Sequence, residues 1–193
     1  MIKLTGILLC GGKSQRMGAD KAMLVLHNQP MFSYSLQILQ QYCAEIFISA
    51  NDNRFDFLGY TVIHDEIENI GPMGGIYACL KKSLNPYNLV LACDMPLITG
   101  TLLTRMVPVN DNYDIITPLI NNRPEPLYAL YHKRIVKKIE QLIDSHIYSL
   151  QQLLSQTNAL YIAGNDNDAK ELFNANTPQE LEVYEQIAKS NLS

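Results

Sequence analysis

The stretch that decides the fold is IKLTGILLCGGKSQRMGADK, residues 2–21. Its apolar run from Ile2 to Leu9 leads directly into a loop that opens with the glycine pair Gly11 and Gly12. A strand followed at once by a glycine-rich loop is typical of the first β-α-β unit of a parallel sheet. Adjacent glycines also let a ligand approach the backbone closely. The stretch therefore predicts a ligand-binding loop at the carboxyl end of a first strand.

The same loop carries two cations, Arg16 and Lys21. Positive charge at the carboxyl end of a strand suits a triphosphate, because α/β sheets bind ligands at this edge. An isolated glycine pair would more often be a surface turn with solvated cations, but this constellation is much longer than two glycines.

Neither common nucleotide-binding motif accounts for this loop. Gly12-Lys13-Ser14 matches the end of a P-loop, but a P-loop also needs a glycine at the position of Ile7. The dinucleotide fingerprint fails as well, because Gly11, Gly12 and Gly18 do not have the G-x-G-x-x-G spacing. The loop must be interpreted from its other residues.

The rest of the sequence alternates short apolar runs with segments of helical periodicity, which predicts β-α-β units on a parallel sheet. Further strands are expected at Glu45 to Ser49, Tyr60 to His64, Asn88 to Ala92, Asp114 to Leu119 and Leu127 to Tyr131. Helices are expected from Phe32 to Cys43 with Pro30 opening the first turn, from Gly75 to Ser83, from Ile135 to Ile143, and from Pro178 onward.

Length and composition indicate one globular domain over residues 1–193, because 47% of the residues are hydrophobic and only 18% are charged. The net charge of −4 argues against general attraction to nucleic acid or to an anionic membrane. No segment approaches the roughly 20 apolar residues of a membrane span. The four cysteines have no C-x-x-C spacing, which favours reduced, buried thiols in a cytoplasmic protein.

The glycine-rich loop resembles the L-A-G-G-x-S-x-R-M-G-x-D-K signature of the molybdopterin nucleotidyltransferases. This sequence departs from it chiefly at Cys10, where the family usually has alanine. Both side chains are small, so a backbone role for this position is retained. Among these enzymes the loop is most similar to that of the molybdenum cofactor guanylyltransferases, which have glycine at the position of Gly11.

The resemblance continues along the chain, in the expected order. Asn51 and Asp65 each follow a predicted strand, as in the family. Further segments resemble the family's G-P-L-A-G turn, its C-D-M-P strand end and its F-x-N-x-N-T-P ending: Gly71-Pro72-Met73-Gly74-Gly75, Cys93-Asp94-Met95-Pro96 and Phe173-Asn174-Ala175-Asn176-Thr177-Pro178.

This resemblance implies a Rossmann-like three-layer α/β sandwich with a mostly parallel central sheet. The implied reaction transfers GMP from GTP to molybdopterin, with Mg²⁺ held by Asp94 and with cofactor insertion proteins and apo-molybdoenzymes as possible partners. Arg16 and Lys21 are the other implied catalytic residues. The resemblance assigns nucleotide and pterin binding to Leu9, Cys10, Gly11, Gly12, Arg16, Lys21, Asn51, Asp65, Gly74, Gly75, Asp94, Asn174 and Asn176.

Structural alternatives accompany several of these assignments. Asp94, Asn51 and Asp65 are residue types that also occur in ordinary turns after strands, and Asn176 can cap a helix. The segment from Arg123 through Glu125 to Pro126 would either line the pterin side or form a plain connection.

Two other functions compete with guanylyl transfer. Cytidylyltransferases for the same pterin have a loop similar to L-A-A-G. This chain has Gly11 in place of the second alanine, and the extra space favours a purine over a pyrimidine. A noncatalytic nucleotide or pterin carrier would be expected to lose the metal carboxylate or the cationic loop, and both are present.

Overall fold

The computed structural model describes residues 3–11, 21–106 and 112–173, with the side chain of Lys21 left out. Within these ranges no helix is long and apolar enough to cross a membrane. The main sheet has the order β10-β7-β9-β6-β1-β4-β5, and β8 pairs with β7 outside this path. Its strands are β1 (Leu4–Leu9), β4 (Glu45–Ser49), β5 (Thr61–Ile63), β6 (Tyr87–Ala92), β7 (Ile115–Ile120), β8 (Arg123–Pro124), β9 (Tyr128–His132) and β10 (Ala159–Ala163).

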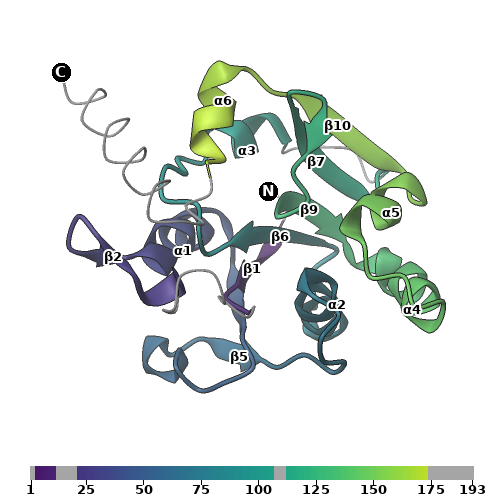
Figure 1. Cartoon of the computed structure of the whole chain (residues 1–193), viewed down its shortest axis with the longest axis horizontal. Coiled ribbons are helices and arrows are strands. Elements are labelled where there is room, and N and C mark those ends of the chain that lie inside the picture. The colour runs from purple at the N-terminus through teal and green to yellow at the C-terminus, as the bar shows by residue number, and fades with distance from the viewer. Residues whose placement is uncertain (1–2, 12–20, 107–111, 174–193) are drawn as a thin grey trace.

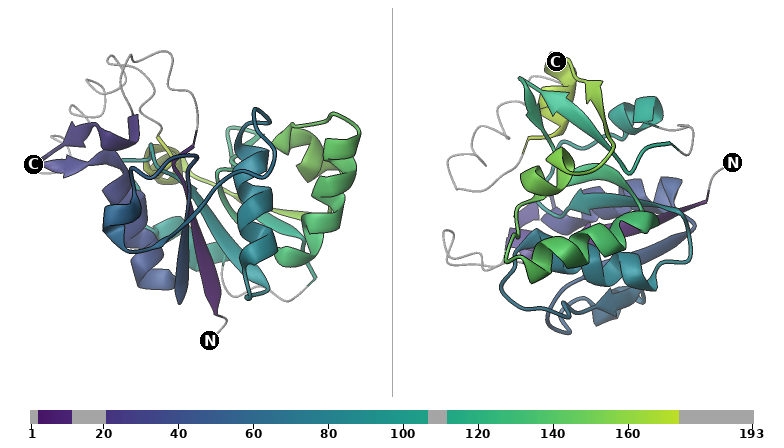
Figure 2. Two further views of the ribbon diagram at one scale, coloured as in Figure 1. Left: turned by 90° about the horizontal axis from the view of Figure 1, so that it is seen from below. Right: turned by 90° about the vertical axis from the view of Figure 1, so that its right-hand side faces the viewer.

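Helices cover both faces of this sheet (Figure 1). They are α1 (Met31–Tyr42), α2 (Pro72–Lys82), α3 (Thr101–Met106), α4 (Val136–Asp144), α5 (Leu150–Ser155) and α6 (Asp166–Glu171). The left view of Figure 2 shows the sheet nearly edge-on, with α1 on one side and α2 and α4 on the other. Short 3-10 turns occur at Lys21–Met23, Asp56–Leu58 and Lys133–Ile135, and β2 (Val25–Leu26) and β3 (Gln29–Pro30) form a separate hairpin.

Successive side chains of a strand point to opposite faces of the sheet, and here each face has its own apolar core. Leu8 and its register partner Leu91 pack into the core under α1 and α3, whereas Ile7 and its partner Val90 pack under α2, α4 and α5. The central strands are therefore apolar on both faces, as expected for a parallel sheet covered by helices. This arrangement confirms the predicted three-layer sandwich.

The sheet is parallel except at β9 and the short β8. β1 pairs in parallel with both β4 and β6, and β10 pairs in parallel with β7. β9 runs antiparallel to β6 and to β7. The reversal follows from a tight connection after β7, in which Asn121 and Asn122 adopt positive φ of 49° and 62°. Asparagine tolerates this region, so β8 and β9 can fold straight back beside β7.

Several elements were not anticipated from the sequence. These are the β2-β3 hairpin, α3, α5, β10 and α6, all of which are six residues or shorter. The predicted α2 also starts earlier, at Pro72 rather than Gly75, and Pro30 precedes the first residue of α1 as its cap. The expected helix from Pro178 lies outside the described residues.

Close packing of α2 against β4 depends on Gly75. A Cβ atom at this position would lie 2.1 Å from Oγ and 3.2 Å from Cβ of Ser49, and 3.2 Å from Cδ2 of Leu9. Ser49 is buried, so it has little freedom to move away. Gly75 therefore allows the first turns of α2 to approach the carboxyl ends of β1 and β4.

Gly75→Ala should lower the free energy of unfolding by about 1–3 kcal/mol through overpacking. The sign of the change in stability makes this a sharp test, because at an exposed helical position alanine stabilises the helix by about 1 kcal/mol relative to glycine. Urea denaturation of Gly75→Ala beside Ser49→Ala/Gly75→Ala measures the effect, and removing the Ser49 hydroxyl should recover part of the loss. A more stable Gly75→Ala protein would contradict the close contact.

Candidate functional site

A cavity of about 680 Å³ opens at the carboxyl edge of the parallel strands. It lies at the topological switch point, because the chain runs from β1 outward to β4 and β5 and then returns to β6 on the other side of β1. Open α/β sheets bind ligands at this position. The lining residues are Leu9, Cys10, Gly11, Ala22, Asn51, Asp52, Arg54, Asp65, Glu68, Asn69, Gly71, Pro72, Ala92, Cys93, Asp94 and Leu127.

The first wall of the cavity is the end of β1. Leu9, Cys10 and Gly11, which the resemblance assigns to nucleotide binding, all line it. The amide of Cys10 donates to the carbonyl oxygen of Ser49 at 2.9 Å, which fixes the backbone just before the glycine pair. Among the described residues, a Cβ atom at Gly11 would meet the carbonyl oxygen of Ser49 alone, at the ordinary contact distance of 3.9 Å.

The cationic part of the loop is not placed by the structure. Gly12 and Arg16 lie outside the described residues, and Lys21 is placed only as the first residue of a 3-10 turn that ends at Met23. Their contacts with phosphate therefore stay predictions from the sequence. Asn174 and Asn176 likewise lie outside the described residues.

Asn51 and Asp65 form a paired unit on the second wall. The side-chain amide of Asn51 donates to Oδ2 of Asp65 at 3.0 Å, and its Oδ1 accepts from the amide of Asp65 at 2.8 Å. The two hydrogen bonds tie the loop after β4 to the loop after β5 and hold the Asp65 carboxylate at the cavity. The structure thus brings together two residues that are fourteen positions apart in the sequence.

Asp94 follows β6, where it is half-buried and lines the cavity. The parallel register pairs Leu9 with Ala92 at the ends of β1 and β6, and Gly11 and Asp94 each follow two residues later and line the same cavity. In the described residues, no cluster of three or more histidine, cysteine or acidic side chains could hold a metal. A single carboxylate nevertheless suits Mg²⁺, which is commonly held by one or two carboxylates together with substrate phosphates and water.

Gly74 and Gly75 were expected to let a ligand approach closely, and this role stays a prediction. Both are buried, and neither is among the residues that line the cavity. A Cβ atom at Gly74 would lie 3.1 Å from the carbonyl oxygen of Ile67, so this glycine, like Gly75, permits contact with protein. Gly71 and Pro72, earlier in the same turn, line the cavity instead, and Gly71 has a positive φ of 65° that favours glycine.

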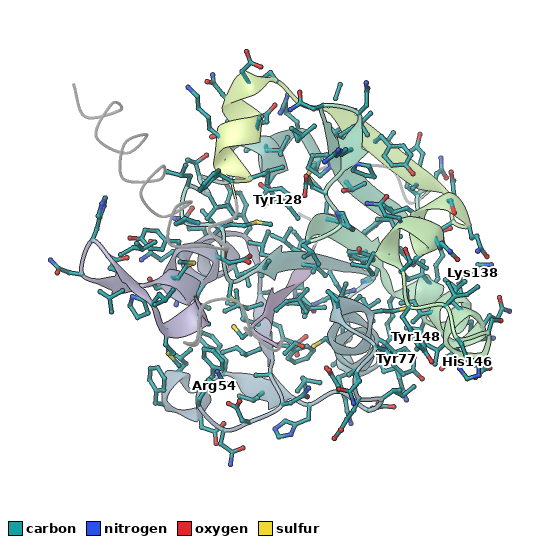
Figure 3. All side chains as sticks on the ribbon, in the orientation of Figure 1. Arg54, Tyr77, Tyr128, Lys138, His146 and Tyr148 are labelled. Carbon is teal, nitrogen blue, oxygen red and sulfur yellow. The ribbon has the colours of Figure 1, made fainter. Side chains whose placement is uncertain are left out.

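Several lining residues were missed from the sequence, among them Asp52 and Arg54 on the loop after β4. Figure 3 shows Arg54 on the β5 side of the molecule. Its Nε donates to both carboxylate oxygens of Asp52, at 2.6 and 2.8 Å, and this hydrogen bonding lowers the pKa of Asp52. In the sequence, the place of these two residues just after Asn51 was the only sign of a role in the site, since charged residues are common in surface loops.

Arg123, Glu125 and Pro126 lie on β8 and the connection to β9, outside the group of lining residues. Burial raises the pKa of Glu125, with Arg123 opposing the shift. Leu127, the next residue, does line the cavity, and its carbonyl oxygen accepts from the amide of Ala92 at 3.0 Å. The segment therefore approaches the cavity from the β9 side.

Glu171, at the end of α6, anchors the loop that follows Asp94. Its carboxylate accepts hydrogen bonds from the amide of Gly100 at 2.9 Å, from Oγ1 of Thr99 at 2.8 Å, and from the hydroxyl of Tyr128 at 3.3 Å. Burial and the neighbouring Glu171 raise the pKa of Tyr128, so its hydroxyl stays a donor. Tyr128 lies close to α6 in Figure 3.

The described chain then reaches Phe173, which packs with Leu97 against the small core of Leu26 and Met31. Leu97 belongs to the loop that follows Asp94, three residues after it. The end of the described chain therefore lies against that loop, just ahead of the asparagine pair that the sequence assigns to the pterin.

A cavity at the switch point of a Rossmann-like sheet, lined by a glycine after one strand and a carboxylate after the next, places this chain among the α/β proteins that bind ligands at this edge. Comparisons with known proteins narrow this class. Residues 6–160 match the MobA-like NTP transferase domain. The chain therefore belongs to the MobA-like NTP transferase family.

Individual relatives agree over nearly the whole chain. The molybdenum cofactor guanylyltransferase of Vibrio vulnificus is 32% identical, over 94% of this chain and 94% of its own. A probable molybdenum cofactor guanylyltransferase of Flavobacterium johnsoniae is 30% identical, over 94% and 96%. The crystal structure of molybdopterin-guanine dinucleotide biosynthesis protein A from Archaeoglobus fulgidus shares the fold, with a TM-score of 0.82 at 23% identity over 97% of this chain and 100% of that one.

Asn51→Ala should weaken nucleotide binding by roughly 5-fold or more, because Asp65 loses the two hydrogen bonds that hold it at the cavity, each worth about 0.5–1.5 kcal/mol. Isothermal titration calorimetry measures the affinity. Asn53→Ala is the matched control, since Asn53 is an exposed asparagine on the same loop that does not line the cavity. Equal losses in the two variants would contradict a specific role for the Asn51–Asp65 pair.

Proposed function

We propose that this chain transfers GMP from GTP to molybdopterin and releases pyrophosphate. The observation that carries the proposal is the cavity at the switch point, which is lined by Gly11 just after β1 and by Asp94 just after β6. The names of the relatives at 30–32% identity supply the substrates. A cytoplasmic location and the partners that receive the product stay predictions from the sequence.

The chemistry is a substitution at the α-phosphorus of GTP. An oxygen of the terminal phosphate of molybdopterin forms the new P–O bond, and the bond between the α-phosphorus and the bridging oxygen to the β-phosphate breaks. Two polyanions must meet, so positive charge is needed to offset their repulsion and to stabilise the transition state. Arg16 and Lys21 are proposed to supply this charge from the loop after β1.

Asp94 is proposed to hold Mg²⁺, which would neutralise phosphate charge when bound. Its position at the end of β6, half-buried in the cavity wall, supports this role. A carboxylate oxygen is the donor that Mg²⁺ prefers. Asp65 is proposed to accept hydrogen bonds from the nucleoside, because Asn51 already fixes its backbone amide and one carboxylate oxygen.

Asn174 and Asn176 are proposed to contact the pterin. Phe173 packs in one small core with Leu97, on the loop after Asp94, which supports a location for this pair near the catalytic carboxylate. The nucleotide and the pterin would then approach Asp94 from different sides of the cavity.

Asp94→Asn should lower kcat by orders of magnitude while changing the melting temperature little, because the shape of the side chain is kept and the ionised oxygen ligand is lost. Mg²⁺ titrations of pyrophosphate release measure the effect. Asp52→Asn is the matched control, a second carboxylate at the cavity that is already engaged by Arg54. Near-normal turnover of Asp94→Asn would make Asp94 a turn residue.

GTP should support turnover far better than CTP, because the space beside Gly11 accommodates a purine. Parallel assays on molybdenum-loaded molybdopterin compare the two nucleotides. Gly11→Ala should erode the preference without unfolding the protein, since in the described part of the chain the added methyl group meets a single backbone oxygen, at 3.9 Å. Equal efficiencies in the unmodified protein would favour the cytidylyltransferase alternative, and nucleotide binding without pyrophosphate release would favour a carrier.

A further inference from the structure

Two cysteines line the cavity at neighbouring strand ends. The parallel pairing of β1 with β6 ends at Leu9 and Ala92, and the next residues along the chain are Cys10 and Cys93. The amide of Cys93 donates to the carbonyl oxygen of Leu9 at 3.1 Å, which holds Cys93 beside the end of β1. Neighbouring strands lie about 4.8 Å apart, which is within the Cα separation of roughly 4.4–6.8 Å that a disulfide requires.

Both side chains also lie on the same face of the sheet. Leu8 and its register partner Leu91 belong to the core under α1, which covers this face of the sheet. Cys10 belongs to this core and Cys93 packs against it. Both also line the cavity, Cys10 with 7% of its surface exposed and Cys93 with a larger share.

The other two cysteines have different surroundings. Cys79 lies on α2, in the core on the opposite face of the sheet, and Cys43 follows α1 and packs near Gly6 in the middle of β1. Neither lines the cavity. Burial raises the pKa of both thiols, to about 12 for Cys43, which makes them poor nucleophiles. They are therefore matched internal controls.

We propose that Cys10 and Cys93 form an oxidisable dithiol that hydroperoxides convert to a disulfide, and that this bond blocks nucleotide use. The sulfur of Cys93, the more exposed of the two cysteines, would attack the peroxide, breaking the O–O bond to form a sulfenic acid and releasing an alcohol or water. The thiol of Cys10 then attacks the sulfenic sulfur, the S–S bond forms, and the oxygen leaves as water. The two thiols lose two electrons in total, and the peroxide gains them.

The disulfide should be readily reversible. Directly opposed residues on parallel strands do not have ideal disulfide geometry, and strained disulfides are more easily reduced. A dithiol reductant would therefore restore the two thiols.

The functional effect rests on the proposed GTP-dependent activity. The bond would join the residue before Gly11 to the residue before Asp94, which are the two sides of the proposed triphosphate and metal site. Drawing Cys10 and Cys93 together shifts both neighbours, and a displacement of about 1 Å at reacting groups costs roughly a hundredfold in rate.

Peptide mapping tests the linkage independently of activity. Trypsin cleaves after lysine and arginine, so each cysteine falls on its own peptide, with Cys10 in residues 4–13 and Cys93 in residues 83–105. The full-length reduced protein is treated with hydrogen peroxide, alkylated and digested. We expect one linked pair, 4–13 with 83–105, two hydrogens lighter than the separate peptides and lost on treatment with dithiothreitol. A linkage through Cys43 or Cys79, or over-oxidised Cys93 without a linkage, overturns the proposal.

Turnover and nucleotide binding are then measured before oxidation, after oxidation and after reduction. We expect GTP turnover to fall by roughly a hundredfold and to recover with dithiothreitol. Cys43→Ala and Cys79→Ala should behave like the unmodified protein. Cys10→Ala and Cys93→Ala, each compared with its own reduced form, should resist peroxide.

The outcomes separate the two proposals. A mapped disulfide with unchanged nucleotide binding and turnover refutes the blocking effect. A reduced protein that forms the disulfide yet never turns over GTP contradicts the proposed function and leaves the dithiol standing.

Discussion

The parallel pairing of β1 with β6 is the constraint on which the site depends. These two strands are the point at which the chain reverses its progress across the sheet, and open α/β sheets bind ligands between the carboxyl ends of such strands. Their register ends at the pair Leu9 and Ala92, so Gly11 and Asp94 follow from neighbouring strand ends and line the same cavity. A slip by one residue would turn every side chain to the other face and would dismantle both cores together.

Packing on either side protects this register. Gly75 brings α2 against β1 and β4, and Glu171 holds the loop after Asp94 from the opposite direction. The cavity is therefore framed by buried elements, while its polar residues stand on the loops between them. Rigid walls with polar groups at the rim are what a site for a highly charged substrate needs, because reorganising the protein during the reaction would cost free energy.

The central strands and the long helices could be predicted from the sequence because their periodic apolar patterns extend over several turns or residues. The elements that were missed are short, and α6 is marked mainly by a capping box of Asn165 and Asp168 rather than by periodicity. Asp65 and Asn51 were assigned through the resemblance, but their mutual hydrogen bonds depend on strand register, which no single sequence reveals. Gly74 and Gly75 show the opposite case. Glycine signals close approach without saying to what, and here the neighbour is protein.

The reversed direction of β9 has a further consequence for how such an enzyme could diversify. Because β9 runs against its neighbours, the site receives the start of this strand, at Leu127, beside the ends of the parallel strands. The segment from Asn121 to Pro126 can therefore change in length or composition without disturbing the β1 and β6 edge. The β1 and β6 half of the sheet keeps a fixed geometry, while the sequence of the neighbouring hairpin can vary. Related enzymes could therefore acquire new acceptor substrates while they retain the same nucleotide donor.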